Sequence, residues 1–498
     1  MKAFLMHKDR DFDLLQQLPW NEIALTQDLE LRTLLNAMSS NDKFLYEVIK
    51  KAVLSPLYDP EAIKYRQDIL KDCLKNSSVI RELYRIPVES SENKKRYWMG
   101  ISSRYPSSLL HSSIEMMQMF VGLLKKLKKI ANEQAHKFHS EGFTTFFAMI
   151  RKELDDGYFT VVQHHLKELK FGRGVLISAE LGKGNEGTNY ILRKPHGKNK
   201  NWIKRIIAKK TPNYGFRISD RDEAGARALS ELENRGINTV ANALAQSADH
   251  IDSFLKMLQI ELAFYVGCIN LHEQLVEIGE PVCFPNPSPS EEKQYNFKGL
   301  YDVCLALTIK HKVISNDLDA NGKDFMIITG ANQGGKSTFL RSIGIAQLMM
   351  QSGMFVPALY FSANVCDALF THFRREEDLT MQSGKLDEEL NRMNKIVDQL
   401  TPNAMILFNE SFAATNDREG SEICRQMVNV LYENRIKVFF VTHLYEFAHY
   451  YYEKHSADIV FLRADRQPDG TRTFRLIEGE PLQTSFGKDL YEKIFEAK

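Results

Sequence analysis

The chain has 498 residues, 43% of them hydrophobic and 26% charged, which is ordinary for a globular protein with two to four domains. Its net charge is +1, so any surface that attracts a polyanion must be local. The six cysteines are scattered without a CxxC pair, which argues against disulfides and a zinc site. No signal peptide and no apolar run of about 18 residues is evident, so a cytoplasmic protein without a membrane partner is expected.

Most of the sequence before residue 286 has a helical pattern. Helices are expected over 150–169 and 251–269, where apolar residues recur every three or four positions. A third helix is indicated by the same spacing at Leu110, Ile114, Met117, Val121, Leu124, Leu127 and Ala131. We divide this region into helical segments 1–95, 96–171 and 220–285, with an insertion at 172–219.

The insertion differs from the helical segments in composition and pattern. It is rich in glycine, and apolar and polar residues alternate in it, as they do in strands. From Gly187 to Ser219 it holds nine lysines and arginines, no acidic residue, and interleaved aromatic rings. Such a stretch suits contacts with nucleic-acid phosphates, although a solvated basic surface is the simpler reading. The candidate DNA-binding residues are Arg193, Lys194, Lys198, Lys200, Trp202, Lys204, Arg205, Lys209 and Lys210.

A proline-rich break at 280–291 precedes a C-terminal region in which strands and helices alternate. Short apolar runs predict strands at Met326–Thr329, Met405–Phe408 and Val438–Val441. Alternation of this kind predicts a parallel sheet whose strands end at one common edge.

The first of these strands runs into GANQGGKST, Gly330 to Thr338, which fits the phosphate-loop pattern GxxxxGK[ST]. Its glycines let backbone N–H groups converge on phosphates, Lys336 supplies a cation, and the Ser337 hydroxyl can bind magnesium. A chance match in a glycine-rich turn is the alternative. The predicted nucleotide contacts are Gly330, Asn332, Gly334, Gly335, Lys336, Ser337 and Thr338.

The second strand, in NAMILFNESFAAT, ends at Asn409 and Glu410. Glu410 is the expected general base toward the attacking water, unless it is a plain surface acid. Asn409 stands where such ATPases carry an aspartate, so magnesium binding is expected to be weaker by about 1–2 kcal/mol. The predicted metal-site residues are therefore Ser337, Asn409 and Glu410.

The third strand, in VFFVTHLYEFA, ends at His443. A histidine at this edge can reach the γ-phosphate or the attacking water, although a lone histidine there is more often structural. With the two preceding motifs in the same chain order, we predict catalytic roles for Lys336, Glu410 and His443.

These motifs resemble the MutS family of DNA mismatch-repair ATPases. The resemblance is carried by residues 326–358, 369–379, 408–420, 439–448 and 484–495, with a weaker likeness at 44–70. It implies an α/β P-loop ATPase domain of the ABC class at 286–498. That domain would follow a mostly α-helical core and lever region with a small clamp-like β insertion.

The resemblance also implies a homodimer in which each ATP lies between one subunit's phosphate loop and the other's signature segment. By position that segment is MQSGKLDEEL, residues 381–390, and Ser383 and Gly384 would face the partner's γ-phosphate. A solvated helix start is the alternative. Ile314 and Asn316 would contact adenine, although Val313 stands in place of the usual stacking aromatic ring.

The expected function is that of an ATPase that uses ATP and magnesium to open or close a clamp on duplex or branched DNA. The sequence has no GxF[YF]E motif, so we expect no mismatch reading and no mismatch-recognition or connector domain. The alternative is a nucleotide-gated interaction or RNA-binding protein with weak or no ATP turnover. A transporter subunit is disfavoured, because the sequence has no LSGGQ-type signature.

Overall fold

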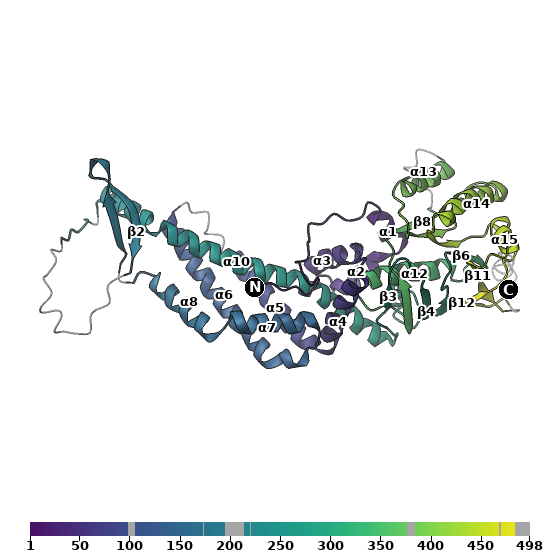
Figure 1. Ribbon diagram of the computed structural model, residues 1–498, viewed down its shortest axis with the longest axis horizontal. Helices are drawn as coiled ribbons and strands as arrows, with labels where there is room; N and C mark the ends of the chain where they lie inside the picture. Colours follow the sequence, from purple (N-terminus) through teal and green to yellow (C-terminus); the bar gives the residue numbers. More distant parts are fainter. Residues whose placement is uncertain are drawn as a thin grey trace, which may run out of the picture. The chain divides into compact units, whose positions relative to one another are not determined.

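The computed structural model describes residues 1–97, 105–172, 174–194, 214–219, 221–375, 384–467 and 470–483 (Figure 1). The chain divides into two compact units. Unit 1 comprises Met1–Ala3, Arg81–His136 and Thr144–Gln259. Unit 2 comprises Phe4–Ile80, Lys137–Phe143 and the residues from Ile260 onward.

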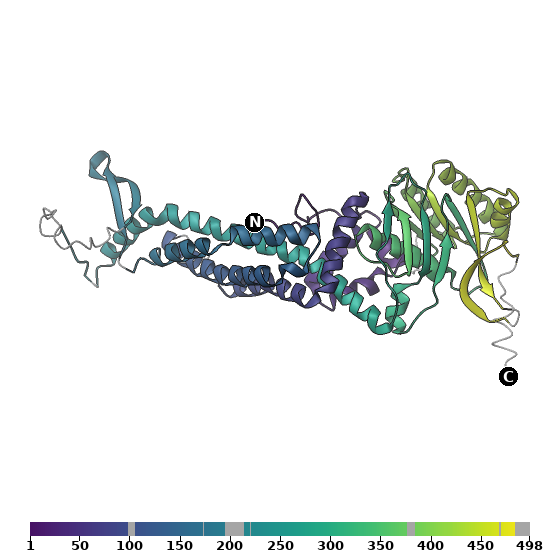
Figure 2. The ribbon, with the colours of Figure 1, turned by 60° about the horizontal axis from the view of Figure 1, so that its bottom comes forward.

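The described residues of unit 1 form helices and one β-hairpin. The strands β1 (Leu176–Leu181) and β2 (Gly187–Arg193) are antiparallel, and the short helix η3 (Lys183–Asn185) joins them (Figure 2). The apolar positions predicted for the helix around Leu110–Ala131 are all buried in α6, which confirms that helix. The helices that contribute to unit 1 are α5 (Ser77–Tyr97), α6 (Pro106–Gln134), α7 (Glu141–Glu153), α8 (Asp156–Glu168) and α10 (Glu223–Ile278).

The single helix predicted over 150–169 is wrong, because α7 ends at Glu153 and α8 begins at Asp156. The Asp155 carboxylate accepts a hydrogen bond from the Tyr158 backbone N–H at 2.6 Å, and so caps a new helix. Buried apolar residues occur on both sides of this break, at Ile150, Leu154 and Phe159.

In unit 2, short helices precede the sheets. They are α1 (Glu22–Asp28), α2 (Leu31–Ser39), α3 (Lys43–Leu54) and α4 (Pro60–Lys75), with the end of α10. The short helix η2 (Ala135–Lys137) lies where the chain passes from unit 1 to unit 2. Asp42 caps α3, and Asp59 caps α4 ahead of Pro60. These caps fix where the helices begin.

The described remainder of unit 2 contains two sheets and several helices. The larger has the strand order β12-β11-β6-β10-β9-β8, and all neighbours are parallel except β11 and β12. Its strands are β6 (Phe325–Gly330), β8 (Leu369–Phe373), β9 (Met405–Asn409), β10 (Lys437–Val441), β11 (Ile459–Arg466) and β12 (Arg472–Glu478). The three predicted strands and their parallel pairing are thus confirmed.

The smaller sheet has the order β3-β7-β4-β5. Its strands are β3 (Asn286–Ser288), β4 (Tyr295–Leu300), β5 (Asn316–Asp319) and β7 (Tyr360–Asn364). The helices of this region are α11 (Val303–Ile309), α12 (Lys336–Gln351), α13 (Lys385–Val397), α14 (Asp417–Glu433) and α15 (Tyr445–Glu453). Residues of β6, β9 and β10 form one apolar core with α14 and α15.

Among the described residues, only α10 is long and apolar enough to cross a membrane. Of the 18-residue stretch that meets this test, 78% is buried inside the protein. Burial of this extent is what the core helix of a soluble protein shows, so length and composition alone are weak grounds for a membrane span.

Candidate nucleotide site

The loop after β6 is folded tightly against the neighbouring strand β11. Gly330 has a φ of +107°, a backbone conformation that favours glycine. A Cβ atom added at Gly334 would lie 2.6 Å from the Ala464 Cβ and 2.8 Å from the Ala331 carbonyl oxygen. The loop therefore has no room for a side chain at Gly334, and its backbone leads directly into α12.

The N-terminus of α12 faces the space that this loop encloses. The helix begins at Lys336, and its N-cap residue Gly335 offers no side-chain cap to the first N–H groups. A helix of 16 residues carries a partial positive charge at this end. The loop and helix together form a site suited to phosphate.

Lys336 as a whole is 5% exposed, and its amine donates to the carbonyl oxygens of Gly330 and Ala331, each at 3.0 Å. Burial lowers the pKa of Lys336. The nearby Glu410 carboxylate raises this pKa, and the Arg472 guanidinium lowers it further. The amine thus spans its own loop, and phosphate oxygens would be alternative acceptors for the same N–H groups.

Two of the predicted metal-site residues meet directly. The Ser337 hydroxyl donates to the Asn409 side-chain carbonyl at 2.9 Å, which brings α12 and the end of β9 together. Both are hard oxygen donors of the kind that magnesium prefers, and Glu410 follows Asn409 with a carboxylate. Among the described residues, no group of three or more His, Cys, Asp and Glu side chains could hold a metal by itself. The donor set therefore fits an ion that is completed by phosphate and water.

Strand β10 lies between β6 and β9, so its carboxyl end falls between the phosphate loop and Glu410. The Glu410 backbone N–H donates to the Val441 carbonyl oxygen at 2.9 Å, and Thr442 N–H donates to the Ile328 carbonyl oxygen at 3.0 Å. His443 comes next and is exposed. The three motifs thus lie at one edge of the sheet, as their spacing predicted.

The two residues expected near adenine differ in their surroundings. Ile314 is 49% exposed, so its side chain is open to contact. Asn316 is buried in β5, and its side-chain oxygen accepts a hydrogen bond from the Leu476 backbone N–H at 2.7 Å. The side-chain oxygen of Asn316 is therefore engaged in a hydrogen bond with strand β12.

Gly384 is the N-cap residue of α13 and is exposed, with open space where a Cβ atom would lie. Ser383, its predicted companion, lies outside the described residues. The structure therefore gives the start of α13 but not the contact that was predicted there.

Of the candidate DNA contacts, Arg193 and Lys194 are described. The Arg193 guanidinium donates to the Ser178 hydroxyl at 2.9 Å, and the Lys194 amine lies 3.3 Å from the Glu168 carboxylate. The remaining candidates lie outside the described residues: Lys198, Lys200, Trp202, Lys204, Arg205, Lys209 and Lys210.

Sequence reasoning missed Arg472 and Ala464, which both contact the phosphate loop. The Arg472 guanidinium donates to the Asn332 carbonyl oxygen at 2.8 Å from strand β12. Ala464 lies opposite Gly330 in the pairing of β11 with β6. Arg472 lies 140 residues from Asn332 in the sequence, Ala464 is similarly distant from the loop, and no local signal in the sequence marks either residue.

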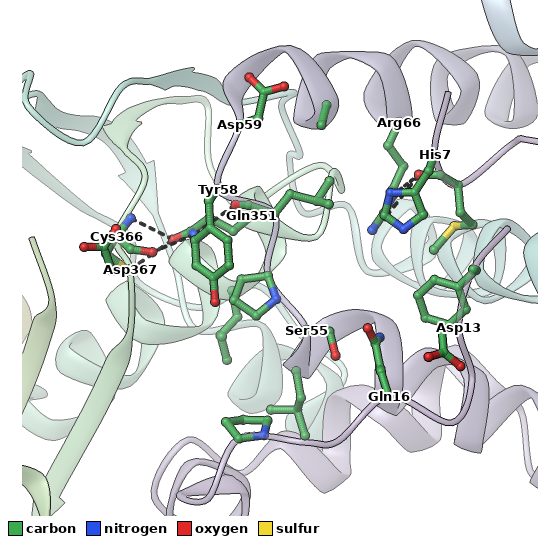
Figure 3. A pocket seen from close by; sticks show the side chains of 18 of the residues that line it. His7, Asp13, Gln16, Ser55, Tyr58, Asp59, Arg66, Gln351, Cys366 and Asp367 are labelled. Atoms are coloured by element: carbon green, nitrogen blue, oxygen red, sulfur yellow. Dashed lines mark hydrogen bonds between the residues drawn. The ribbon is translucent and has the colours of Figure 1, made fainter. Parts of the chain in front are cut away.

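A cavity of unit 2 with a volume of about 1640 Å³ lies away from this site (Figure 3). No residue of the phosphate loop lines it. Beside it, the buried Arg66 guanidinium donates hydrogen bonds to the carbonyl oxygens of Met6 and Ser352. The Gln351 side chain forms hydrogen bonds with the backbone N–H and carbonyl oxygen of Cys366. These contacts tie the N-terminal segment to the end of α12.

Comparison with known families assigns most of the chain. The family model described as "MutS2 N-terminal domain" matches residues 58–278, and the one described as "MutS domain V" matches residues 326–495. The second match contains the phosphate loop, Asn409, Glu410 and His443.

Curated relatives carry related names. DNA mismatch repair protein MSH3 of Kluyveromyces lactis is 23% identical over 464 residues, covering 80% of this chain and 44% of the relative. DNA mismatch repair protein MutS of Caldanaerobacter subterraneus subsp. tengcongensis is 21% identical over 443 residues, covering 80% and 49%. MutS protein homolog 4 of Homo sapiens is 25% identical over 252 residues, covering 49% and 26%.

The matched part of the chain thus spans from about a quarter to about half of the length of these relatives. Within that part lie a helical region similar to the MutS2 N-terminal domain and a C-terminal domain of the ATPase type. The chain belongs to the MutS family, with part of that family's domain content.

Proposed function

We propose that the protein is an ATP-dependent DNA-binding protein that hydrolyses ATP between two copies of the chain and thereby opens or closes a clamp on DNA. The observation that carries the proposal is the 2.9 Å contact of Ser337 with Asn409, one residue from Glu410, beside the phosphate loop. Domain V of the MutS family is an ATPase domain, and the relatives named above include DNA mismatch repair proteins.

In this proposal the loop N–H groups and the Lys336 amine bind the triphosphate, and its oxygens take the place of the Gly330 and Ala331 carbonyls on Lys336. Bound magnesium would neutralise charge on the phosphates. Ser337 and Asn409 offer it oxygen donors. Glu410 accepts a proton from the attacking water, and the exposed His443 orients that water or the γ-phosphate.

The second copy would complete the site through the start of α13, where Ser383 and Gly384 would offer hydrogen bonds to the γ-phosphate. DNA would be held by the basic residues between Arg193 and Lys210, through phosphates rather than bases. Mismatch reading has no part in this proposal, and neither do a membrane or a transporter.

The proposal is tested by a binding panel of single-stranded, duplex and branched DNA and matched RNA, with and without ATP, at several salt concentrations. If six of the basic residues contact phosphates, the plot of log affinity against log salt concentration should have a slope of about −5 for duplex DNA. Replacing Lys198, Lys200, Lys204 and Arg205 by glutamine should flatten that slope. Absence of DNA binding at low salt, in every nucleotide state, would contradict the proposal.

One observation favours a second candidate, a nucleotide-gated interaction or RNA-binding protein with little turnover. The metal-site pair of Ser337 and Asn409 is uncharged, so Glu410 alone supplies a carboxylate there. Steady-state ATP hydrolysis by wild type and by Glu410→Ala separates the two candidates. Turnover that disappears with Glu410 supports the ATPase, whereas tight ATP binding without turnover in wild type supports the second candidate.

A further inference from the structure

One buried histidine of unit 2 lies beside the turn that carries Glu410. His372 is on β8 and is fully buried. Its Nε2 atom is 3.0 Å from the main-chain oxygen of Glu389 in α13, and its Nδ1 atom is 2.7 Å from the Ser411 hydroxyl. The ring therefore joins α13 to the residue that directly follows Glu410.

The protonation of the ring follows from these partners. Burial lowers the pKa of His372 to about 3, so the ring is neutral and carries one N–H. The Glu389 carbonyl oxygen can only accept, so the proton lies on Nε2. Nδ1 is then an acceptor, and the Ser411 hydroxyl shares its single proton between Nδ1 and the His372 carbonyl oxygen at 2.5 Å.

The turn from Glu410 to Phe412 needs such support. Glu410 has a φ of +52° and Phe412 a φ of +60°, and both are non-glycine residues in the left-handed region. A conformation of this kind persists only where the surroundings hold it. The Phe412 ring stacks on His372, with 5.0 Å between ring centroids and 18° between planes. His372 thus contacts both residues that follow Glu410.

We propose that His372 is a positioning residue that fixes the Glu410 carboxylate and couples its position to that of helix α13. The inference rests on the proposed function, in which Glu410 is the general base and the start of α13 faces the partner's nucleotide. A displacement of α13 would reach Glu410 through two hydrogen bonds and one ring stack. The two ring nitrogens divide this role, since Nδ1 holds the turn and Nε2 holds the helix.

A positioning role makes a different prediction from that of an ordinary core residue. The phosphate loop follows β6, and β10 and β9 separate that strand from β8. Loss of the His372 contacts should therefore leave ATP affinity unchanged and slow the chemical step. General damage to the domain would lower affinity, turnover and melting temperature together.

The experiment compares three variants of the full chain. His372→Phe keeps the ring stack and loses both hydrogen bonds. His372→Asn keeps an acceptor near the Nδ1 position, and His372→Gln keeps a donor near the Nε2 position. We expect His372→Phe to lower kcat by about ten- to hundredfold, with KM for ATP within about twofold of wild type. His372→Asn should recover more kcat than His372→Gln, because it preserves the contact with Ser411.

Two further variants serve as a check and a control. Ser411→Ala removes the contacts of this hydroxyl with Nδ1 and with the His372 carbonyl oxygen, without a substitution in β8, and should lower kcat without lowering ATP affinity. His272→Phe is the matched control, because His272 is also a ring-packed histidine of unit 2, 5.6 Å from the Phe355 ring, but lies on α10. It should leave kcat unchanged.

Hydrogen exchange of the Glu410–Phe412 amides gives a readout that does not need turnover. Faster exchange in His372→Phe than in His272→Phe, at equal melting temperature, supports the inference even if wild type hydrolyses no ATP and the proposed function fails. Unchanged exchange at this turn would overturn the inference. So would a kcat for His372→Phe equal to that of an active wild type, or a loss of ATP affinity as large as the loss of kcat.

Discussion

Asn409 sets the charge that the phosphate site can offer a metal. Its side-chain oxygen accepts from the Ser337 hydroxyl at 2.9 Å, so the geometry of a Ser–Asp pair is kept without the negative charge. A neutral amide oxygen still orients a metal or its water, but attracts the cation less than a carboxylate does. Asparagine instead of aspartate at position 409 thus removes one negative charge from the site without changing the size of the side chain.

Asn409→Asp is therefore expected to lower the magnesium concentration at half-maximal ATP binding or turnover by about five- to thirtyfold, corresponding to about 1–2 kcal/mol. A magnesium titration of nucleotide binding measures this. Asn434→Asp is the charge control, because Asn434 is exposed at the end of α14 and should leave the titration unchanged. An unaltered titration for Asn409→Asp would mean that residue 409 does not face the metal.

A second residue-scale prediction concerns pH. Glu261 of α10 is fully buried and accepts from the backbone N–H groups of Leu5 and Phe12, at 2.6 and 3.2 Å. Burial raises the pKa of Glu261 to about 7. The folded state then holds a proton that the unfolded chain releases near pH 4.5, so this group's stabilising effect is full below pH 4.5 and is lost as pH rises through 7.

Melting curves should therefore show stability falling by about 1–3 kcal/mol from pH 5 to pH 8. Glu261→Gln, which keeps the shape without an ionisable proton, should flatten that part of the profile. The prediction fails if the variant and wild type lose stability equally over this range.

At the scale of elements, the phosphate loop depends on strand β11 as well as on its own glycines. Gly334 lies so close to Ala464 and Ala331 that a methyl group must move the backbone. We expect Gly334→Ala to weaken ATP binding about tenfold or more, with little change in melting temperature. Gly122→Ala is the control, since open space surrounds Gly122 in α6, and it should stabilise the chain by about 0.5–1 kcal/mol. Isothermal titration calorimetry measures ATP binding, and thermal melting measures the stability of each variant.

The elements also show what sequence can and cannot predict. Strands β6, β9 and β10 were predicted within one residue, because each is a short buried apolar run that ends at a glycine or polar residue. The break between α7 and α8 was missed, because Leu154 and Tyr158 keep a four-residue apolar spacing across Asp155. The loop contacts of Arg472 and Ala464 were missed because they arise only when residues far apart in the sequence fold together.

At the scale of the whole molecule, the proposed function requires a second copy of the chain to complete the nucleotide site. A Cβ atom at Gly384, the N-cap of α13, would meet no described atom within 4 Å, and in the proposed function this end of α13 faces the γ-phosphate held by the loop of the other copy. Nucleotide should therefore control association, because the bound phosphate adds contacts between copies that the free chains lack.

Glu410→Gln, which removes the base and keeps the side-chain shape, should hold ATP without cleaving it and should sediment at twice the mass of one chain. Lys336→Ala should keep the mass that the protein has without nucleotide, because its phosphate loop lacks the amine that spans Gly330 and Ala331. Sedimentation velocity with ATP, ADP and no nucleotide measures this. Equal masses in all three conditions for Glu410→Gln would separate nucleotide binding from association and exclude the shared site.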